Sequence, residues 1–350
     1  MPHITLPEKG SSREDILFAL KSMKTGDADW HNGQLFGLIY DAGEEVETLV
    51  KEAASLFMIE NGLSPMTFPS LLKMENEVIS MVLSLMEGDH ETVGCLTAGG
   101  TESIFMAIKS ARDWARQEKP EIEKPQMVVP MTAHPAWNKA AHYLGIDIVM
   151  VPVNDGFRAD PRAMQDAINE NTIILGATAV TYPHGMVDPI PAIGALAEEN
   201  NLWLHVDACL GEEGFLKLAQ DARTAAEKIM AGIEATPPLY VLGKPDATVF
   251  AFGGHDVNIY ELSARLKERG WHAEAQHLPA SLHMTVSPIH HAIVDNFLKD
   301  LKDAVKDLPT ADAEDVSEMA AMYGMIGTMT DRKMAKEFAL AYLDDLYKLK

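Results

Sequence analysis

The chain has 350 residues, of which 29 are basic and 52 acidic, so its formal net charge at neutral pH is −23. A chain this acidic lacks the positive surface that binds nucleic acid or anionic membranes, which excludes those two classes of partner. Only two cysteines occur and no apolar stretch is long enough to span a membrane. We therefore expect a cytoplasmic globular protein with neither a secretion signal nor a disulfide framework.

The first part of the chain predicts helices. Ser12 precedes apolar residues at helical spacing, and residues 44–60 and 70–86 repeat this pattern. A stretch rich in turn-forming residues at 61–69 separates these two helices. We expect residues 1–69 to form an N-terminal helical segment.

From Glu91 onward, short apolar runs alternate with helical stretches, which is typical of a parallel sheet covered on both faces. The expected strands are 93–97, 127–129, 146–153, 172–177 and 202–206. The expected helices are 103–116, 138–143, 161–168 and 190–199. This order predicts an α/β domain over residues 70–212.

After Gly211 the pattern changes to long helices and short, separate strands. The expected helices are 215–233, 257–269, 289–305 and 331–350, and the expected strands are 240–242, 248–252 and 282–286. Such a mixture predicts a smaller α+β domain over residues 213–350. The acidic stretch 307–318 is expected to be an exposed linker.

Two glycines stand between an expected strand and the helix that follows it. Gly99 and Gly100 allow a tight turn, and Thr101 adds a hydroxyl group. The new helix would point its free N–H groups at any anion there, so the turn is a candidate cradle for a phosphate or carboxylate. The alternative is a capped helix after a glycine turn.

A second candidate site ends the last strand of the α/β domain. His205, Asp207 and Cys209 would face one side of that strand. A buried acid there requires a partner, which is either the protonated ring nitrogen of a cofactor or a metal ion held by all three side chains. A structural partner, such as an arginine or a helix N-terminus, is the third alternative.

Histidines follow two further strands. His134 comes after the second expected strand, and His184 lies in the segment Tyr182–Asp188. Because parallel strands end at one edge of a sheet, both should lie near the diglycine turn and Asp207. A lone histidine in such a loop is more often a hydrogen-bonding residue than a catalyst. His283 and the other late histidines show no metal-binding spacing and are interpreted as structural.

Several motifs together resemble one family. They are TAGGTESIFM (97–106), AHPAWNKAA (133–141), YPHGMVDP (182–189), HVDACLG (205–211), VLGKPD (241–246) and YGMIGTMTDR (323–332). In this order they resemble the pyridoxal-phosphate-dependent group II decarboxylases, sphingosine-1-phosphate lyase branch. The resemblance implies an α/β fold of the aspartate-aminotransferase type (fold type I). It also implies pyridoxal 5'-phosphate as cofactor, and a homodimer that cleaves a carbon–carbon bond of a small amine or amino acid.

The resemblance also implies roles for individual residues. The cofactor phosphate would be held by Gly99, Gly100, Thr101 and Glu102. His134 would stack on the ring, Asp207 would pair with the ring nitrogen, and His205 would support Asp207. Thr181 and His184 would lie near the ring. Asn61 and Ser64 would lie on the substrate side, where Ser64 replaces a histidine of the long-chain-base lyases and so leaves the substrate open.

The chain departs from the family pattern after Asp207. The family carries a His-Lys pair there whose lysine binds the cofactor covalently, and no His-Lys dipeptide occurs in this sequence. Roughly a hundred residues are absent at this point by resemblance, far more than ordinary loop variation. Neither Lys139 nor Lys217 offers a substitute. We therefore expect an incomplete large domain and an impaired lyase. The alternatives are a non-catalytic partner of a full-length relative, or a metal-binding protein.

Overall fold

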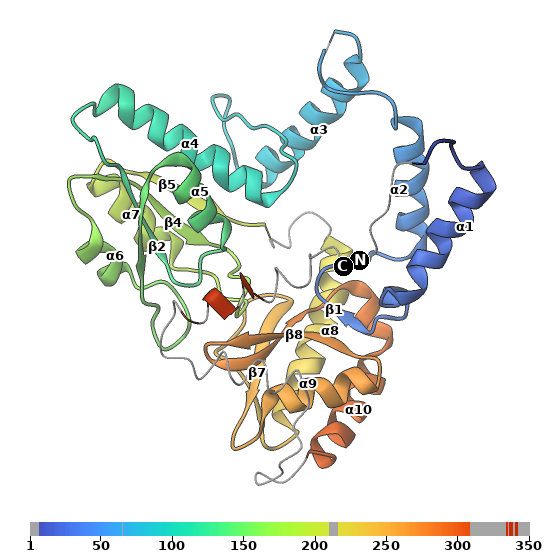
Figure 1. Ribbon diagram of the computed structural model, residues 1–350. Coiled ribbons are helices and arrows are strands. Elements are labelled where there is room, and N and C mark those ends of the chain that lie inside the picture. The colour runs from blue at the N-terminus through green and yellow to red at the C-terminus, as the bar shows by residue number, and fades with distance from the viewer. Residues whose placement is uncertain are drawn as a thin grey trace.

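The computed structural model describes residues 7–64, 66–209 and 216–308, together with 334, 336–338 and 340–341. Two sheets, each with its own helices, lie side by side, and three N-terminal helices extend from them (Figure 1). The expected acidic linker and the expected C-terminal helix fall almost entirely outside the described residues.

The first sheet is parallel, as the alternation of strands and helices predicts. Its strands run in the order β3-β2-β4-β5, and each pairs with its neighbours in parallel. The strands are β2 (Gln126–Pro130), β3 (Asp147–Val151), β4 (Thr172–Thr178) and β5 (Trp203–Asp207). The central strands β2 and β4 are buried along their whole length, which explains their continuous apolar sequence.

Helices cover both faces of this sheet. One face packs against α4 (Gly100–Glu118) and α5 (Ala136–Leu144), and the other against α6 (Pro161–Ala167) and α7 (Ile190–Glu199). Trp137 of α5 approaches β4 so closely that a methyl group at Gly176 would lie 2.6 Å from its ring. Glycine at this position therefore permits the tight packing of α5 on the sheet.

One expected strand is wrong. Residues 93–97 form no strand, and all of them are exposed except Thr97, which is half-buried. Leu96 N donates to the Glu75 carboxylate at 3.2 Å, and no strand of the described chain lies beside this run. A short apolar segment without a neighbouring strand cannot form a β-ladder, whatever its sequence favours.

The second sheet has the order β1-β8-β9-β7-β6 and is antiparallel except for the β1–β8 pair. Its strands are β1 (Leu35–Phe36), β6 (Leu239–Val241), β7 (Val249–Gly254), β8 (His272–His277) and β9 (Ala280–Thr285). It packs on α8 (Leu216–Glu234), α9 (Ile259–Glu268) and α10 (Val294–Lys306). The sequence did not predict β1 or β8, and β1 brings the N-terminal segment into this sheet.

The N-terminal helices bury none of their side chains. They are α1 (Arg13–Met23), α2 (Glu44–Leu56) and α3 (Pro69–Leu85). Apolar side chains are exposed on all three, among them Phe18, Leu49 and Met81. Within the described chain, no helix combines the length and apolar character that crossing a membrane requires.

Candidate functional site

The polar residues that the sequence singled out in the first domain gather where its parallel strands end. His134 follows β2, the segment Thr181–Asp188 follows β4, and Asp207 is the last residue of β5. The diglycine turn begins α4 at the same edge, because the Cys209 sulfur lies 3.1 Å from the position that a Gly100 Cβ would take. Ligands of parallel α/β sheets bind at this edge.

The first turn of α4 presents free backbone N–H groups. Its N-cap residue, Gly99, has a φ of 152°, and no side chain caps the helix there. The amides of Gly100 and Thr101 lie in the first turn, where an α-helix supplies no internal acceptor. The Glu102 carboxylate turns back and accepts from Ala98 N at 2.6 Å. This geometry suits a phosphate group at the N-terminus of a long helix.

A cavity of about 610 Å³ opens beside this turn, between α4 and α5. Its walls include Gly99–Glu102, Lys109, Lys139 and Tyr143. The Lys139 ammonium lies 5.9 Å from the centre of the Tyr143 ring. A phosphate held by the first turn of α4 would therefore share this cavity with a cation.

Asp207 ends β5 as a nearly buried carboxylate, with 9% of its surface exposed. One carboxylate oxygen accepts from Cys209 N at 3.1 Å. His205, two residues earlier, packs its ring 5.5 Å from that of Trp137. Burial lowers the pKa of His205, and the negative charge of Asp207 opposes this shift. His205 thus packs on α5, and Cys209, two residues after Asp207, lies at the N-terminus of α4.

Several buried polar atoms at this edge have no hydrogen-bond partner among the described residues. They are the hydroxyl oxygens of Thr132 and Thr178, Nε2 of His205 and both ring nitrogens of His184. Each such atom costs about 1–3 kcal/mol when it stays unpaired, so a group of them points to a ligand or water that completes their bonding. Together with the free amides of α4 and the Asp207 carboxylate, they fit a phosphorylated heterocycle whose ring nitrogen carries a proton.

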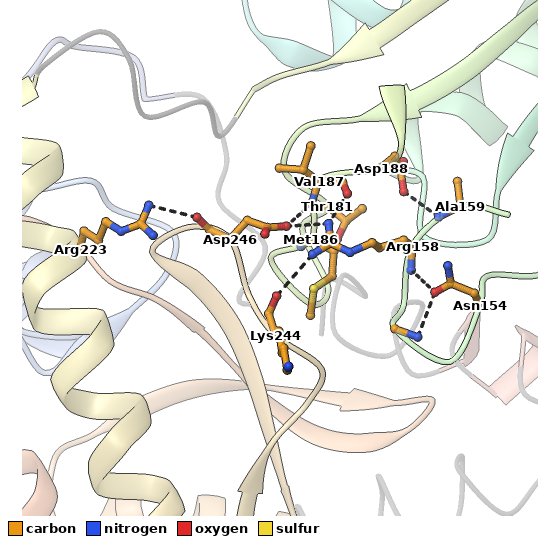
Figure 2. Close-up of polar contacts among 11 residues, drawn as sticks. Asn154, Arg158, Ala159, Thr181, Met186, Val187, Asp188, Arg223, Lys244 and Asp246 are labelled. Atoms are coloured by element: carbon orange, nitrogen blue, oxygen red, sulfur yellow. Dashed lines mark hydrogen bonds and ion pairs between the residues drawn. The ribbon is translucent and has the colours of Figure 1, made fainter. Parts of the chain in front are cut away.

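The loop after β4 is held by its own hydrogen bonds (Figure 2). Thr181 N donates to Met186 O at 2.8 Å, and the Thr181 hydroxyl accepts from Met186 N at 3.1 Å. The Asp188 carboxylate accepts from Ala159 N and Thr178 N, each at 2.8 Å. Burial raises the pKa of Asp188 despite these two hydrogen bonds. Asp188 therefore ties the end of this loop back to the first sheet.

An ion pair from the loop after β3 and a hydrogen bond from the loop after β4 join the first sheet to the segment before β7, as Figure 2 shows. Arg158 Nη1 lies 2.6 Å from Asp246 Oδ2, and that oxygen also accepts from Val187 N at 2.8 Å. Arg223 of α8 donates to the Asp246 carbonyl at 3.3 Å. Burial alone would raise the pKa of Asp246, but the hydrogen bonds from Arg158 and Val187 outweigh it and lower this pKa. We call these four residues the interdomain clamp.

The two histidines expected beside a cofactor ring have different surroundings. His184 is buried and stacks on Phe157, with ring centres 4.3 Å apart. Burial lowers its pKa to about 4, because the charged form loses hydration. His134 is exposed, and its Nδ1 accepts from Ala136 N at 3.1 Å. His134 is therefore open to a ligand, whereas His184 is enclosed where the loops after β3 and β4 meet.

The expected substrate-side residues lie in the turn between α2 and α3. Asn61 Oδ1 accepts from Leu63 N at 3.2 Å, and Ser64 Oγ accepts from the Thr67 hydroxyl at 2.9 Å. This turn lies at the top of Figure 1, away from the ends of β4 and β5. Among the described contacts, none joins Asn61 or Ser64 to the strand-end residues of the same chain.

The structure does not support the metal alternative. Within the described residues, no three or more His, Cys, Asp or Glu side chains are arranged to hold a metal ion. Burial, followed by the charge of Asp207, raises the pKa of the Cys209 thiol. A thiol must lose its proton to bind a metal, so this environment acts against His205, Asp207 and Cys209 as a ligand set.

The sequence reasoning missed the residues that the second domain contributes. The Tyr182 hydroxyl donates a short hydrogen bond to Glu274 of β8, and Tyr182 stacks on His283 of β9 at 4.2 Å. The alternation of small and polar residues in HAEAQH (272–277) was the available signal for β8. Nothing in the sequence indicated that Glu274 would meet the loop after β4.

The comparisons with known proteins point to one family. The family described as pyridoxal-dependent decarboxylase conserved domain matches residues 3–241. A sphingosine-1-phosphate lyase of Arabidopsis thaliana is 30% identical, over 98% of this chain and 81% of that protein. This alignment has 443 positions, more than the 350 residues of the chain, so at least about ninety residues of the relative have no counterpart here.

Solved structures agree. The sphingosine-1-phosphate lyase of Burkholderia pseudomallei superposes with a TM-score of 0.86 at 26% identity, covering 99% of this chain and 98% of its own. The glutamate decarboxylase of Lactobacillus brevis superposes with a TM-score of 0.78 at 14% identity, over 90% and 97% of the two chains. The second likeness concerns the fold alone. The expected α/β fold of the type I pyridoxal enzymes is therefore confirmed.

Proposed function

This chain belongs to the pyridoxal-dependent decarboxylase family, and from that premise we propose that it is a carbon–carbon lyase that binds pyridoxal 5'-phosphate at the ends of β2, β4 and β5. Bound there, the cofactor would supply an electron sink for the charge that forms on the amine-bearing carbon of a small substrate. The observation that carries the proposal is the buried Asp207 carboxylate, whose partner Cys209 lies against the first turn of α4, among unpartnered polar atoms.

Each residue at the strand ends has a task in this proposal. Gly99, Gly100, Thr101 and Glu102 would hold the phosphate through the first turn of α4. Asp207 would keep a proton on the ring nitrogen, because a buried carboxylate gains most from a cationic partner. His205 would support Asp207 from the same strand, and His134 would lie against the ring. Thr181 and His184 would close the site from the loop after β4.

Catalysis in this chain is impaired in our proposal, because no lysine stands where the family attaches its cofactor. Lys139 lines the cavity beside α4, but it also lies over the Tyr143 ring. Lys217 lies in the first turn of α8, at the start of the second domain. Neither lysine lies in the segment directly after β5, where the family attaches its cofactor. We therefore expect non-covalent binding of the cofactor.

We further propose that two copies assemble into a homodimer in the cytoplasm. The exposed apolar side chains of α1, α2 and α3 support the assembly, and two free cysteines, Cys95 and Cys209, suit a reducing compartment. In such a dimer the turn with Asn61 and Ser64 would reach the site of the other copy and lie on its substrate side.

Titration with pyridoxal phosphate tests the proposal. We expect a spectral change at a stoichiometry of one cofactor per chain, and competition by inorganic phosphate. The Asp207→Asn variant should raise the Kd roughly ten- to hundredfold, because a charge-assisted hydrogen bond contributes about 1.5–3 kcal/mol. The Asp166→Asn variant, which changes an acid of α6 far from the strand ends, should bind like the wild type.

Two results would contradict the proposal. One is equal affinity of the wild type and Asp207→Asn for pyridoxal phosphate, which would show that Asp207 does not pair with the ring nitrogen. The other concerns impairment: borohydride treatment followed by peptide mapping should leave every lysine unlabelled. Stoichiometric label on Lys139 or Lys217 would instead identify a replacement for the family lysine.

A further inference from the structure

Glu274 brings a carboxylate from the second domain to the loop after β4. It lies on β8, half-buried, and accepts the short hydrogen bond from the Tyr182 hydroxyl. Tyr182 is fixed from its other side by His283, which is fully buried and whose Nε2 lies 2.9 Å from the Thr285 hydroxyl. His283 therefore holds the Tyr182 ring in place beside Glu274.

A row of side chains connects Glu274 with the proposed cofactor site. The Tyr40 phenol lies near both Cys209 and Glu274: burial is the largest cause that raises its pKa, and these two groups raise it further. Cys209 in turn lies beside Asp207 and against Gly100. The row therefore runs from the first turn of α4, past Asp207, to β8. A substrate bound next to the cofactor ring would lie along it.

The ionisable groups of this row that carry negative charge are two carboxylates, Asp207 and Glu274, which accept hydrogen bonds from Cys209 N and from the Tyr182 hydroxyl. Burial is the largest cause that raises the pKa values of Tyr40, Tyr182 and Cys209, and a nearby carboxylate, Glu274 or Asp207, raises each of them further. No described lysine or arginine lowers any of the three pKa values. Arg158 and Arg223, the cations of the interdomain clamp, are bound to Asp246.

An ionised carboxylate can accept several hydrogen bonds, and Tyr182 supplies one to Glu274. The remaining acceptor capacity of a half-buried anion is best met by a cation. A carboxylate or phosphate brought to the same place would meet like charge.

We infer that Glu274 selects the substrate by charge, so that the group extending from the amine-bearing carbon toward β8 is a second ammonium rather than a carboxylate or a phosphate. This inference rests on the proposed function, because it places the substrate beside a cofactor at Asp207. The substrate class is then an amino acid with a second ammonium group in its side chain, which loses its α-carboxylate as carbon dioxide and leaves a diamine as product.

The experiment uses stable analogues that need no covalent lysine. Pyridoxal phosphate is coupled by reduction to diamines with two to four methylene groups, and to the ω-amino acids of matching length. Their Kd values are measured by calorimetry with the full chain. We expect the diamine adducts to bind at least tenfold more tightly than the amino-acid adducts. In Glu274→Gln this preference should fall to about twofold or less, a loss that corresponds to one charge-assisted contact.

Two variants serve as controls. Glu268→Gln removes an exposed acid of α9 in the same domain and should keep the wild-type preference. Tyr182→Phe leaves the Glu274 charge in place and should also keep it. A wild type that binds pyridoxal phosphate but shows no preference, or a preference that Glu274→Gln leaves unchanged, would overturn the inference and leave the proposed function standing. Absence of binding by pyridoxal phosphate and by every adduct would overturn both.

Discussion

Among single residues, Gly185 has the strictest steric requirement at the domain contact. Its φ is 73°, and a Cβ at this position would lie 1.7 Å from the Val249 carbonyl oxygen. Gly185 O also accepts from Asp246 N at 2.9 Å. The loop after β4 therefore touches β7 through bare backbone, which only glycine permits.

Replacing Gly185 with alanine should be far more costly than the left-handed conformation alone explains. Gly145 offers the matched control, since its φ is 66° and nothing lies within 4 Å of its Cβ position. We expect Gly145→Ala to lower the free energy of unfolding by about 1–2 kcal/mol and Gly185→Ala by roughly 4 kcal/mol or more. Urea denaturation measures both. Equal losses would show that the domains do not meet at Gly185 as described.

At the scale of elements, the contact between the loop after β4 and β9 contains two neutral histidines. Burial lowers the pKa values of His184 and His283 to about 4 each, and His283 adds to the shift of His184. The unfolded chain takes up protons on both near pH 6.5, whereas the folded chain does not. Acid therefore favours the unfolded chain between pH 6.5 and pH 4.

This difference predicts the pH dependence of stability. From pH 7 to pH 5 the free energy of unfolding should fall by about 2 kcal/mol for each of the two histidines. A double variant, His184→Gln with His283→Gln, should lose that part of the slope, while His142→Gln, at an exposed position of α5, should keep it. Denaturant titrations at a series of pH values measure the slope. An unchanged slope in the double variant would contradict the assigned pKa values.

The elements also show what the sequence could and could not predict. The strands β2 and β4 and the helices beside them were predictable, because burial on two faces leaves a local apolar signature, and the partly buried β5 keeps enough of it to be predicted as well. Residues 93–97 carry a similar signature but have no neighbouring strand, and β1 is too short to show any pattern. At the site, the motifs indicated the diglycine turn and Asp207, whose roles stay predictions. Glu274 is 92 residues from Tyr182, and no local pattern reports such a contact.

At the scale of the whole molecule, the three N-terminal helices leave a large apolar surface exposed. Leu49 of α2 is 64% exposed, although it lies on the apolar face of that helix. The net charge of −23 acts against association of two copies, and salt screens that repulsion. Association through these helices should therefore strengthen as ionic strength rises.

Sedimentation velocity tests the homodimer. We expect a monomer–dimer equilibrium that shifts toward dimer between low and moderate salt. Leu49→Glu should weaken association at least tenfold, because it places a charge in the apolar contact. Leu278→Glu changes a leucine of similar exposure in the turn between β8 and β9 and should leave the equilibrium unchanged. Equal effects of the two variants would show that α2 is not part of the interface.

The position of β5 has a consequence for the carboxylate it carries. β5 is the outermost strand of the first sheet, and β4 is its one neighbour among the described strands. Asp207 thus stands on a margin that is braced from one side, by the β4 ladder and by Ala179 N, which donates to Asp207 O at 2.8 Å. Any polypeptide that paired as a strand with the free edge of β5 would stabilise Asp207 from the other side. Binding of such a strand and binding of a pyridinium ring at Asp207 would then be thermodynamically linked, and each would raise the affinity of the other by the same factor.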